Sequence, residues 1–314
     1  MNLLASMRYL IALSEHGHFG RAALACHITQ PALSNAMKAL EEEFGVVIVK
    51  RGRNYAGLTP EGERVLATAQ RMLREHSVLQ QELRAEADRP RGTLRIGAVP
   101  TAIPVLARFA ARLQARHPGI VPVVLSMSSG QLEAGLERLS LDLALGYTER
   151  MKLQGATLRA WPQYTEHYFL LRRAARPHRN ELQFAPAVPW KEVGALPLAM
   201  LTPDMHNRTI IDSALVTAGV PVRPALETNS ILTLALAVVE GQVCTVMPGA
   251  LVGAVRGYRE LEALPLVEPE VRTPIGFMAQ GSVRPSRALE AAIEMTQDAD
   301  WRKHVAANSG LLES

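Results

Sequence analysis

The chain has 314 residues, which suggests two or three domains, and its 48% hydrophobic and 5% aromatic content is that of ordinary globular domains. The net charge of +4 is compatible with nucleic acid without being diagnostic of it. The two cysteines, Cys26 and Cys244, exclude a disulfide framework and favour a reducing compartment. No apolar run reaches the ~18 residues of a membrane helix, so no membrane partner is expected.

Residues 1–59 are predicted to form a compact all-α unit. Helices are expected at about 3–14, 20–26 and 30–43, with a glycine-containing turn after the first and a break before the third. Leu3, Met7, Leu10 and Leu13 recur at helical spacing. Because Arg8 lies inside this apolar stretch, the segment is interpreted as a folded helix and not as a signal peptide, which predicts a cytoplasmic protein.

The second and third helices have the spacing of a helix-turn-helix, a motif that places its last helix in the major groove of DNA. The inward face of the third helix is expected to be Leu33, Met37, Leu40 and Phe44. The polar face that would meet base edges comprises Thr29, Gln30, Pro31, Ser34, Asn35 and Lys38. The acidic run Glu41–Glu43 is expected to be a solvated helix face.

Two short extended segments surround residues 51–54 and predict a basic wing after the third helix. Arg51 and Arg53, with Lys50, are the side chains expected to contact phosphates or the minor groove. The sequence therefore predicts a winged helix-turn-helix as the DNA-binding domain, with double-stranded DNA as a partner.

A long linker helix is predicted for residues 60–89, with Thr59 as its N-cap and Pro60 in its first turn. Apolar residues follow one another at steps of four and three, the heptad spacing of a helix that pairs with a second copy of itself. The members of this dimerisation seam are Val65, Ala69, Met72, Leu79 and Leu83. His76 lies in the same row and is interpreted as a polar residue that sets the register.

Residues 92–314 alternate between strand-like and helix-like segments, which predicts parallel sheets with helices on both faces. We expect two Rossmann-like α/β lobes, joined by two crossing strands and separated by a cleft. Lobe I is expected at about 92–161 and 268–302, and lobe II at about 162–267.

The amino-terminal residues resemble those of the LysR-type transcriptional regulators. The shared pattern is Phe19, Ala22-Ala23, the run Thr29 to Ser34, Leu40-Glu41, and the run Leu58 to Gly62. The segments "LDLALGY" and "EGQVCTVMPG" also look like landmarks of this family, so the resemblance extends over the whole chain.

This resemblance implies a sequence-specific regulator that bends operator DNA and recruits RNA polymerase under the control of a small effector. It implies an effector-binding domain with the fold of a type 2 periplasmic binding protein. It also implies a homo-oligomer, a dimer or a dimer of dimers, and hence a homotetramer. No cofactor is implied.

Within residues 1–59, three positions depart from the family pattern, and a fourth departure is Leu139 or Ser140, where the family usually has a glycine. His18 and Gly20 replace hydroxyl residues, which removes the usual caps of the second helix. Asn35 replaces a common basic residue, and because asparagine can pair with adenine, the preferred base can differ there.

Candidate effector-binding residues follow from the rule that ligands of open α/β sheets lie beyond the carboxyl ends of the strands, where helix N-termini offer N–H groups. Thr101 and Ser129 are also good N-caps, and the two roles are compatible. The full set is Pro100, Thr101, Ser128, Ser129, Thr202, Pro203, His206, Asn229 and Val246. Hydroxyls and helix ends favour a small organic anion as the effector.

Other classes of function are less well supported. The sequence contains no G-x-S-x-G, GxxxxGK[ST], HExxH or GxGxxG motif, so no enzyme is expected. His16, His18 and His27 lack the cysteine or carboxylate spacing of a metal site, and Cys244 has no second cysteine in its domain. A regulator that works without a ligand remains an alternative, and a solute-binding α/β protein is a weaker one.

Overall fold

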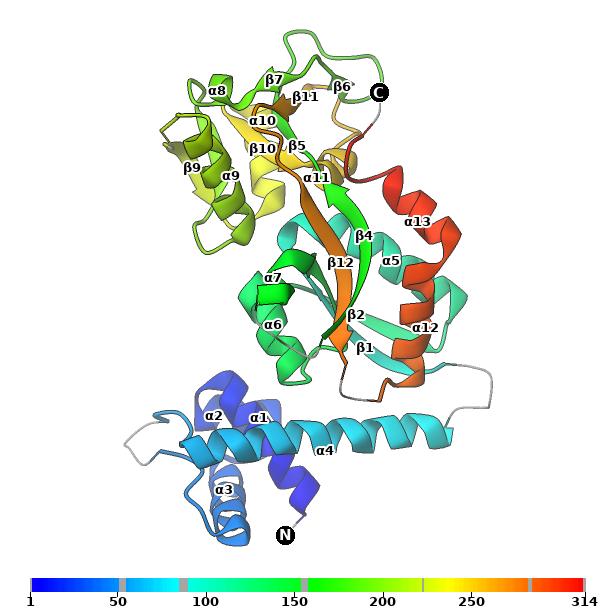
Figure 1. The fold of residues 1–314 in the computed structure, drawn as a ribbon. Helices are drawn as coiled ribbons and strands as arrows, with labels where there is room; N and C mark the ends of the chain where they lie inside the picture. The colour runs from blue at the N-terminus through cyan, green and yellow to red at the C-terminus, as the bar shows by residue number, and fades with distance from the viewer. Residues whose placement is uncertain are drawn as a thin grey trace. The chain divides into compact units, whose positions relative to one another are not determined.

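The structure is a computed structural model that describes residues 2–50, 55–84, 90–153, 158–221, 223–281 and 284–312, without the side chains of 81–84 and 151–153. The chain divides into two compact units, one built from residues 1–86 and the other from residues 87–137 and 141–314. The first unit contains the N-terminal helical domain, here called the head, and the linker helix, and the second contains both α/β lobes (Figure 1).

The head consists of helices α1 (Leu3–His16), α2 (Phe19–Ala25) and α3 (Gln30–Phe44), followed by the linker helix α4 (Pro60–Arg84). Glycines in the left-handed conformation end α1 and α3, at Gly17 and Gly45. Leu33, Met37 and Leu40 are buried as predicted, but Phe44 is 41% exposed. Its predicted inward position was wrong, because α3 ends there and the chain turns away at Gly45.

Helix α2 is capped, although the absence of hydroxyl residues before it predicted that its usual cap would be missing. The Nδ1 atom of His18 accepts hydrogen bonds from the backbone N–H groups of Gly20 (3.0 Å) and Arg21 (3.4 Å). An imidazole therefore does what a hydroxyl does at this position in many helices.

Lobe I has a sheet of order β2-β1-β3-β12-β4. The strands are β1 (Gly92–Ala98), β2 (Ile120–Ser126), β3 (Leu143–Tyr147), β4 (Leu158–Glu166) and β12 (Thr273–Gln280). The covering helices are α5 (Ile103–Arg116), α6 (Ser129–Glu137), α7 (Thr148–Leu153), α12 (Arg287–Gln297) and α13 (Ala299–Ala306), and a 3₁₀ turn, η1, spans Pro100–Ala102.

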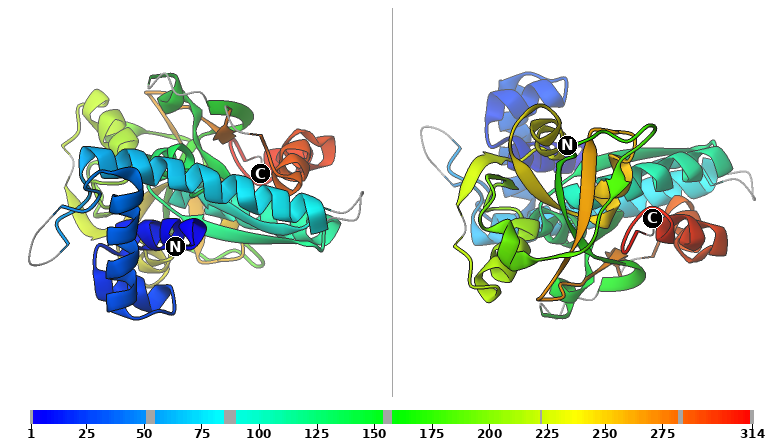
Figure 2. Two further views of the ribbon diagram at one scale, coloured as in Figure 1. Left: turned by 90° about the horizontal axis from the view of Figure 1, so that it is seen from below. Right: turned by 90° about the horizontal axis from the view of Figure 1, so that it is seen from above.

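The helices lie on both faces of this sheet. Figure 1 shows α6 and α7 on one side and α12 and α13 on the other. The C-terminal helices (red) lie against the same lobe as the much earlier strands and helix of residues 92–126 (Figure 2). Phe109 of α5 packs against Phe277 and Trp301, with ring centroids 4.5 and 5.1 Å away, at the centre of this core.

Lobe II has a sheet whose main path is β6-β11-β5-β10-β8-β9, with β7 paired to β11. Its strands are β5 (Tyr168–Arg173), β6 (Gln183–Phe184), β7 (Val188–Pro189), β8 (Leu198–Leu201), β9 (Pro224–Thr228), β10 (Cys244–Pro248) and β11 (Leu261–Val267). Its helices are α8 (Trp190–Val193), α9 (His206–Thr217), α10 (Ile231–Glu240) and α11 (Gly249–Ala254).

Both sheets combine the predicted parallel pairs with antiparallel ones. The crossing strands are the reason, because β12 enters lobe I antiparallel to β3 and β4, and β5 runs antiparallel to β10 and β11. Strand β4 also stays paired with β12 as far as Glu166, which lies beyond the expected lobe boundary near residue 161.

Candidate DNA-binding face and effector site

The predicted recognition residues lie along the start and outer face of α3. Gln30, Pro31, Asn35 and Lys38 are exposed, and Ser34 is half-buried. Thr29 is exposed too, and its hydroxyl accepts a hydrogen bond from the backbone N–H of Ala32 at 3.3 Å. Thr29 therefore caps the helix. The five other predicted residues lie in the first turn of α3 and along one of its faces.

The wing is held to α3 by a contact that the sequence reasoning missed. Oε1 of Glu41 accepts hydrogen bonds from the backbone N–H groups of Ile48 (2.8 Å) and Val49 (3.1 Å). The expectation that Glu41 is merely solvated was wrong. Val49 and Leu58 form the antiparallel bridge at the base of the wing. Arg51 and Arg53 lie outside the described residues.

The wing is also held to the linker helix. The Thr59 hydroxyl donates to the carbonyl of Val47 (2.5 Å) and accepts from the N–H of Gly62 (2.9 Å), as expected of an N-cap. A Cβ atom at Gly62 would overlap the carbonyl oxygen of Ile48. The glycine in the run Leu58 to Gly62 is therefore required by the close approach of α4 to the wing backbone.

The predicted dimerisation seam divides into two parts. Val65 packs against the core of the head, and Ala69 is fully buried. Met72 and Leu79 are 40% and 52% exposed, which is unusual for large apolar side chains on one helix. The Leu83 side chain lies outside the described part of the structure. Pairing through this seam stays a prediction, and Met72 and Leu79 are the residues free to take part in it.

In lobe I, four predicted effector residues lie at the carboxyl ends of β1 and β2. The Thr101 hydroxyl is 3.3 Å from the Tyr147 hydroxyl and makes no helix-capping bond. The cap of α6 is Ser128, whose Oγ accepts from the N–H of Gln131 at 3.4 Å. Ser129 is not the cap, and its buried hydroxyl has no hydrogen-bond partner among the described residues. Pro100, which opens η1, is half-buried.

In lobe II, the residues after β8 have mixed environments. Thr202 and His206 are half-buried, and the Thr202 hydroxyl oxygen is a buried atom without a partner in the described part of the chain. Pro203 and Asn229 are exposed, and Val246 lies inside the lobe II core on β10. The structure thus brings Thr202 and His206 to the start of α9 and leaves Asn229 facing solvent.

Two residues that the sequence reasoning missed complete this region. Tyr147 ends β3 and is buried, with its ring in edge-on contact with the ring of His206 at 4.8 Å between centroids. Asn207 is 5% exposed, and its side-chain nitrogen lies near the Tyr147 and Tyr168 hydroxyls without a partner in hydrogen-bond geometry among the described residues. The rule of strand carboxyl ends, applied to β3, could have found Tyr147.

The Tyr147–His206 contact joins the two lobes and leaves little space beside it. A cavity of about 10 Å³ is lined by Ser129, Glu133, Tyr147 and Arg150, and another of about 10 Å³ is lined by Asn207 and Val246. Either volume is about that of one water molecule. The first cavity lies within lobe I and the second within lobe II, so neither offers room for a small organic molecule.

The charges beside the cleft are largely compensated. Nε of Arg150 is 2.6 Å from Oε1 of Glu133, an ion pair between α7 and α6. Burial lowers the pKa of His206, and the Arg150 charge lowers it further, so the imidazole is neutral at pH 7. The hydrogen-bonding groups at the cleft are thus mostly neutral hydroxyl, phenol, amide and imidazole groups.

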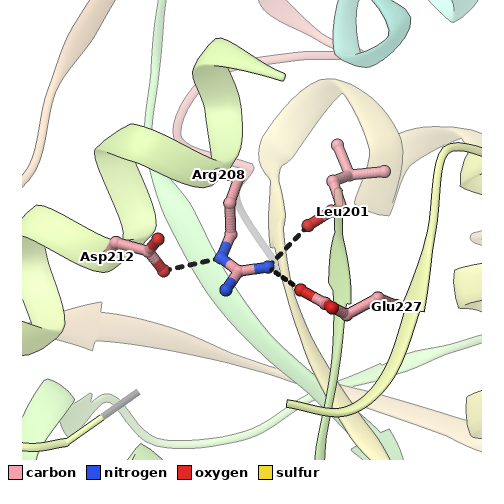
Figure 3. Close-up of polar contacts among 4 residues, drawn as sticks. All are labelled: Leu201, Arg208, Asp212 and Glu227. Atoms are coloured by element: carbon pink, nitrogen blue, oxygen red, sulfur yellow. Dashed lines mark hydrogen bonds and ion pairs between the residues drawn. The ribbon is translucent and has the colours of Figure 1, made fainter. Parts of the chain in front are cut away.

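A buried arginine fixes the start of α9, where His206 and Asn207 lie. Arg208 bonds to Asp212 (2.7 Å), to Glu227 of β9 (2.6 Å) and to the carbonyl of Leu201 on β8 (2.8 Å), as Figure 3 shows. These bonds join three elements of lobe II, so the position of Asn207 depends on them.

Two features are absent from the described residues. These residues contain no group of three or more His, Cys, Asp or Glu side chains that could hold a metal ion. In the same residues, no helix is both long enough and apolar enough to span a membrane.

Comparisons with known proteins agree with this architecture. Residues 4–63 match the bacterial regulatory helix-turn-helix protein, lysR family, and residues 87–301 match the LysR substrate binding domain. The DNA-binding transcriptional dual regulator OxyR of Escherichia coli (strain K12) is 28% identical over 297 residues, 94% of each chain.

Solved structures show the same fold. A full-length OxyR variant from Pseudomonas aeruginosa has a TM-score of 0.68 and 24% identity, and the match covers 93% of this chain and 96% of that chain. Full-length CbnR in complex with its target DNA has a TM-score of 0.63 and 20% identity, over 94% and 98% of the two chains. Because the two family matches together span most of the sequence, the protein belongs to the LysR family of DNA-binding transcriptional regulators.

Proposed function

We propose that this regulator recognises its operator through α3 and the wing, and that a small effector bound between lobes I and II controls its action on DNA. The exposed residues Gln30, Asn35 and Lys38 support the first part, because such side chains can reach base edges from a helix in the major groove. In this proposal Arg51 and Arg53 supply phosphate contacts, which add affinity and little sequence preference.

The observation that carries the effector site is a group of buried polar atoms without partners. They are the hydroxyls of Ser129 and Thr202, which have no hydrogen-bond partner within the described residues. Leaving such atoms unpaired costs about 1–3 kcal/mol each, unless water or a ligand bonds to them. Their presence in both lobes supports a ligand that bonds to both.

The chemistry of these groups favours a small effector that carries acceptor oxygens. Hydroxyls can donate hydrogen bonds, and the amide nitrogen of the neighbouring Asn207 can only donate. A carboxylate offers two strong acceptor oxygens and prefers sites with several converging donors. A small organic anion is therefore the proposed class, held by neutral donors and with the Arg150 charge nearby.

The effector acts, in this proposal, by binding one arrangement of the lobes more tightly than another. Copies of the chain pair through Met72 and Leu79 of the linker helices, as a dimer or a dimer of dimers. A change in lobe angle then alters the spacing of the paired heads, the bend in the DNA and the recruitment of RNA polymerase.

The effector site is tested by thermal shift of the full chain against panels of aliphatic acids, aromatic acids and amino acids. One class is expected to raise the melting temperature in a dose-dependent way, and Ser129→Ala should abolish the rise. Ser213→Ala, at an exposed serine of α9, is the matched control and should leave it unchanged. A rise that Ser129→Ala does not affect would place the effector elsewhere.

The DNA-binding face is tested by selection of operator sequences from a random pool. Gln30→Ala should relax the preferred sequence, whereas Arg51→Ala should weaken binding to all sequences and reduce the salt dependence by about one unit of slope. Gln114→Ala changes an exposed glutamine of α5 outside the head and should alter neither. Unchanged sequence selection by Gln30→Ala would refute the assignment of α3.

A second candidate is a regulator that works without an effector. The edge-on contact between Tyr147 and His206, with only about 10 Å³ of space at Ser129, is the observation that favours it. If no compound class shifts the melting temperature while operator binding is retained, this candidate replaces the effector proposal.

A further inference from the structure

We propose that residues 307–312, the segment after α13, form a third connection between lobes I and II that holds the lobes at a fixed angle. We call this segment the C-terminal strap. The two other connections are the crossings from β4 to β5 and from β11 to β12. Contacts at both ends of the strap and along its backbone support this proposal.

The strap begins firmly in lobe I. Trp301 and Val305 of α13 are buried in the lobe I core. The amide nitrogen of Asn308 donates to the carbonyl of His304 (2.9 Å), and the hydroxyl of Ser309 donates to the carbonyl of Val305 (2.7 Å). These bonds satisfy carbonyl groups of the last turn of α13, so the first strap residues are fixed to lobe I.

The strap ends in lobe II. Leu312 is 8% exposed and belongs to the core cluster that contains Phe169, Leu251 and Val252. Its neighbour Leu311 is 57% exposed. Because one leucine is buried and its neighbour is exposed, the segment packs on lobe II in a definite orientation.

Between these ends, the strap backbone presses against helix α11. Gly249 and Gly253 lie four residues apart, on one face of this helix. A Cβ at Gly249 would overlap the carbonyl oxygen of Gly310, and a Cβ at Gly253 would lie 2.7 Å from the carbonyl oxygen of Asn308. Only glycine, which has no Cβ, allows the two backbones to approach this closely. We call the surface formed by Gly249 and Gly253 the seat of the strap.

The same point of the strap touches the crossing strand β4. Gly310 has a positive φ of 73°, and a Cβ there would lie 2.8 Å from the carbonyl oxygen of Thr165. The next residue, Glu166, is 1% exposed, and its Oε2 accepts from the N–H of Ala250 on α11 at 3.4 Å. The N–H of Gly310 also favours the charged form of this carboxyl group. Strap, crossing strand and α11 therefore meet at Glu166.

Helix α11 lies at the boundary between the two lobes, so a contact with this helix is sensitive to the angle between them. Ala250 is buried in the lobe I core, whereas Leu251 and Val252 are buried in the lobe II core. A change in the angle between the lobes must shift the seat of the strap relative to α13. The strap must then release Leu312 or open its contact with α11, so it opposes such a change.

The strap does not depend on the proposed function, because it concerns the angle between the lobes and needs neither an effector nor DNA. The test measures the distance between the lobes by electron paramagnetic resonance, with spin labels at Glu149→Cys on α7 and Asp204→Cys before α9. Both positions are exposed, and Cys26→Ser and Cys244→Ala remove the native thiols. Dilution into unlabelled full-length chain restricts the signal to distances within one chain.

Leu312→Asp is expected to broaden the distance distribution and shift it to longer distances, whereas Leu311→Asp should leave it as in the parent. A second pair separates loss of the strap from general misfolding. Gly310→Ala and Gly219→Ala introduce the same strain, at φ 73° and 74°, but only Gly310 has a neighbour that a Cβ would strike. Only Gly310→Ala should broaden the distribution.

Distributions for Leu312→Asp and Gly310→Ala that match those of their controls would overturn the strap. Because no effector is needed for this measurement, failure of the strap leaves the effector proposal standing. Conversely, a broadened distribution in a chain that binds no tested acid supports the strap alone.

Discussion

Replacing Glu166 by glutamine should make the stability of the second unit much less dependent on pH. Burial, the largest cause, raises the pKa of this carboxyl group from 4.5 to about 8, although the N–H groups of Ala250, Gly310 and Gly249 favour the charged form. Titratable groups on three strands lie around it: Tyr147, Tyr164 and Tyr168, whose own pKa values are raised, so they stay uncharged.

The sign and size of the effect follow from the two pKa values. Between pH 4.5 and 8 the folded chain keeps a proton that the unfolded chain has lost. The stabilisation of the protonated form is complete below pH 4.5 and is lost as the pH rises through about 8. At 1.36 kcal/mol for each unit, the total change in the free energy of unfolding is roughly 5 kcal/mol.

Glutamine resembles the protonated acid in shape and does not titrate. Thermal or urea unfolding of the full chain at pH 5, 6, 7 and 8.5 should therefore give similar stability for Glu166→Gln and the parent at pH 5, and a variant more stable by several kcal/mol at pH 8.5. Glu290→Gln, at an exposed position of α12, is the control. A constant difference between parent and Glu166→Gln across this range would refute the reasoning, because it would mean that the carboxyl group is charged throughout.

Three further predictions concern other parts of the chain. Gly62→Ala should lower the melting temperature of the head and weaken DNA binding in a gel-shift assay, because the new Cβ would overlap the carbonyl oxygen of Ile48; unchanged binding and melting would contradict the required contact. Arg208→Ala should destabilise lobe II by about 2–3 kcal/mol in urea unfolding, less than for a fully buried pair because its two carboxylate partners are partly exposed. Burial raises the pKa of both Cys26 and Cys244, so both thiols should react slowly with a disulfide reagent at pH 7, and the double serine variant should retain operator binding; fast labelling of the folded protein would argue against this.

The helices of the head could be predicted from the sequence, because the signals that start and end them are local. Thr59 was expected to cap the linker helix and does so, and Thr29 and Gly45 cap α3 through bonds to residues only a few positions away. The contacts that were missed use side chains in unusual roles. His18 caps a helix with a ring nitrogen, and Glu41 bonds to backbone seven and eight residues away.

The candidate effector site was harder to predict, because it depends on contacts between segments distant in the chain. Thr101 and Ser129 could be proposed from their places after β1 and β2. Their relation to Tyr147 and Asn207 could not, since it requires knowledge of how the lobes close. Leu312 carries no pattern at all, since a single leucine near the end of a chain has no periodicity to mark it as buried.

The double attachment of the wing has a mechanical consequence. Glu41 fixes the wing to α3, and Thr59 and Gly62 fix it to α4, so recognition helix, wing and linker helix move as one rigid piece. The 25 residues of α4 make a rod roughly 37 Å long. Tilting such a rod by about 10° displaces its far end by roughly 6 Å, nearly two base-pair steps. A small rotation at the end of α4 away from the head would therefore move α3 by a distance comparable with the rise between base pairs of DNA.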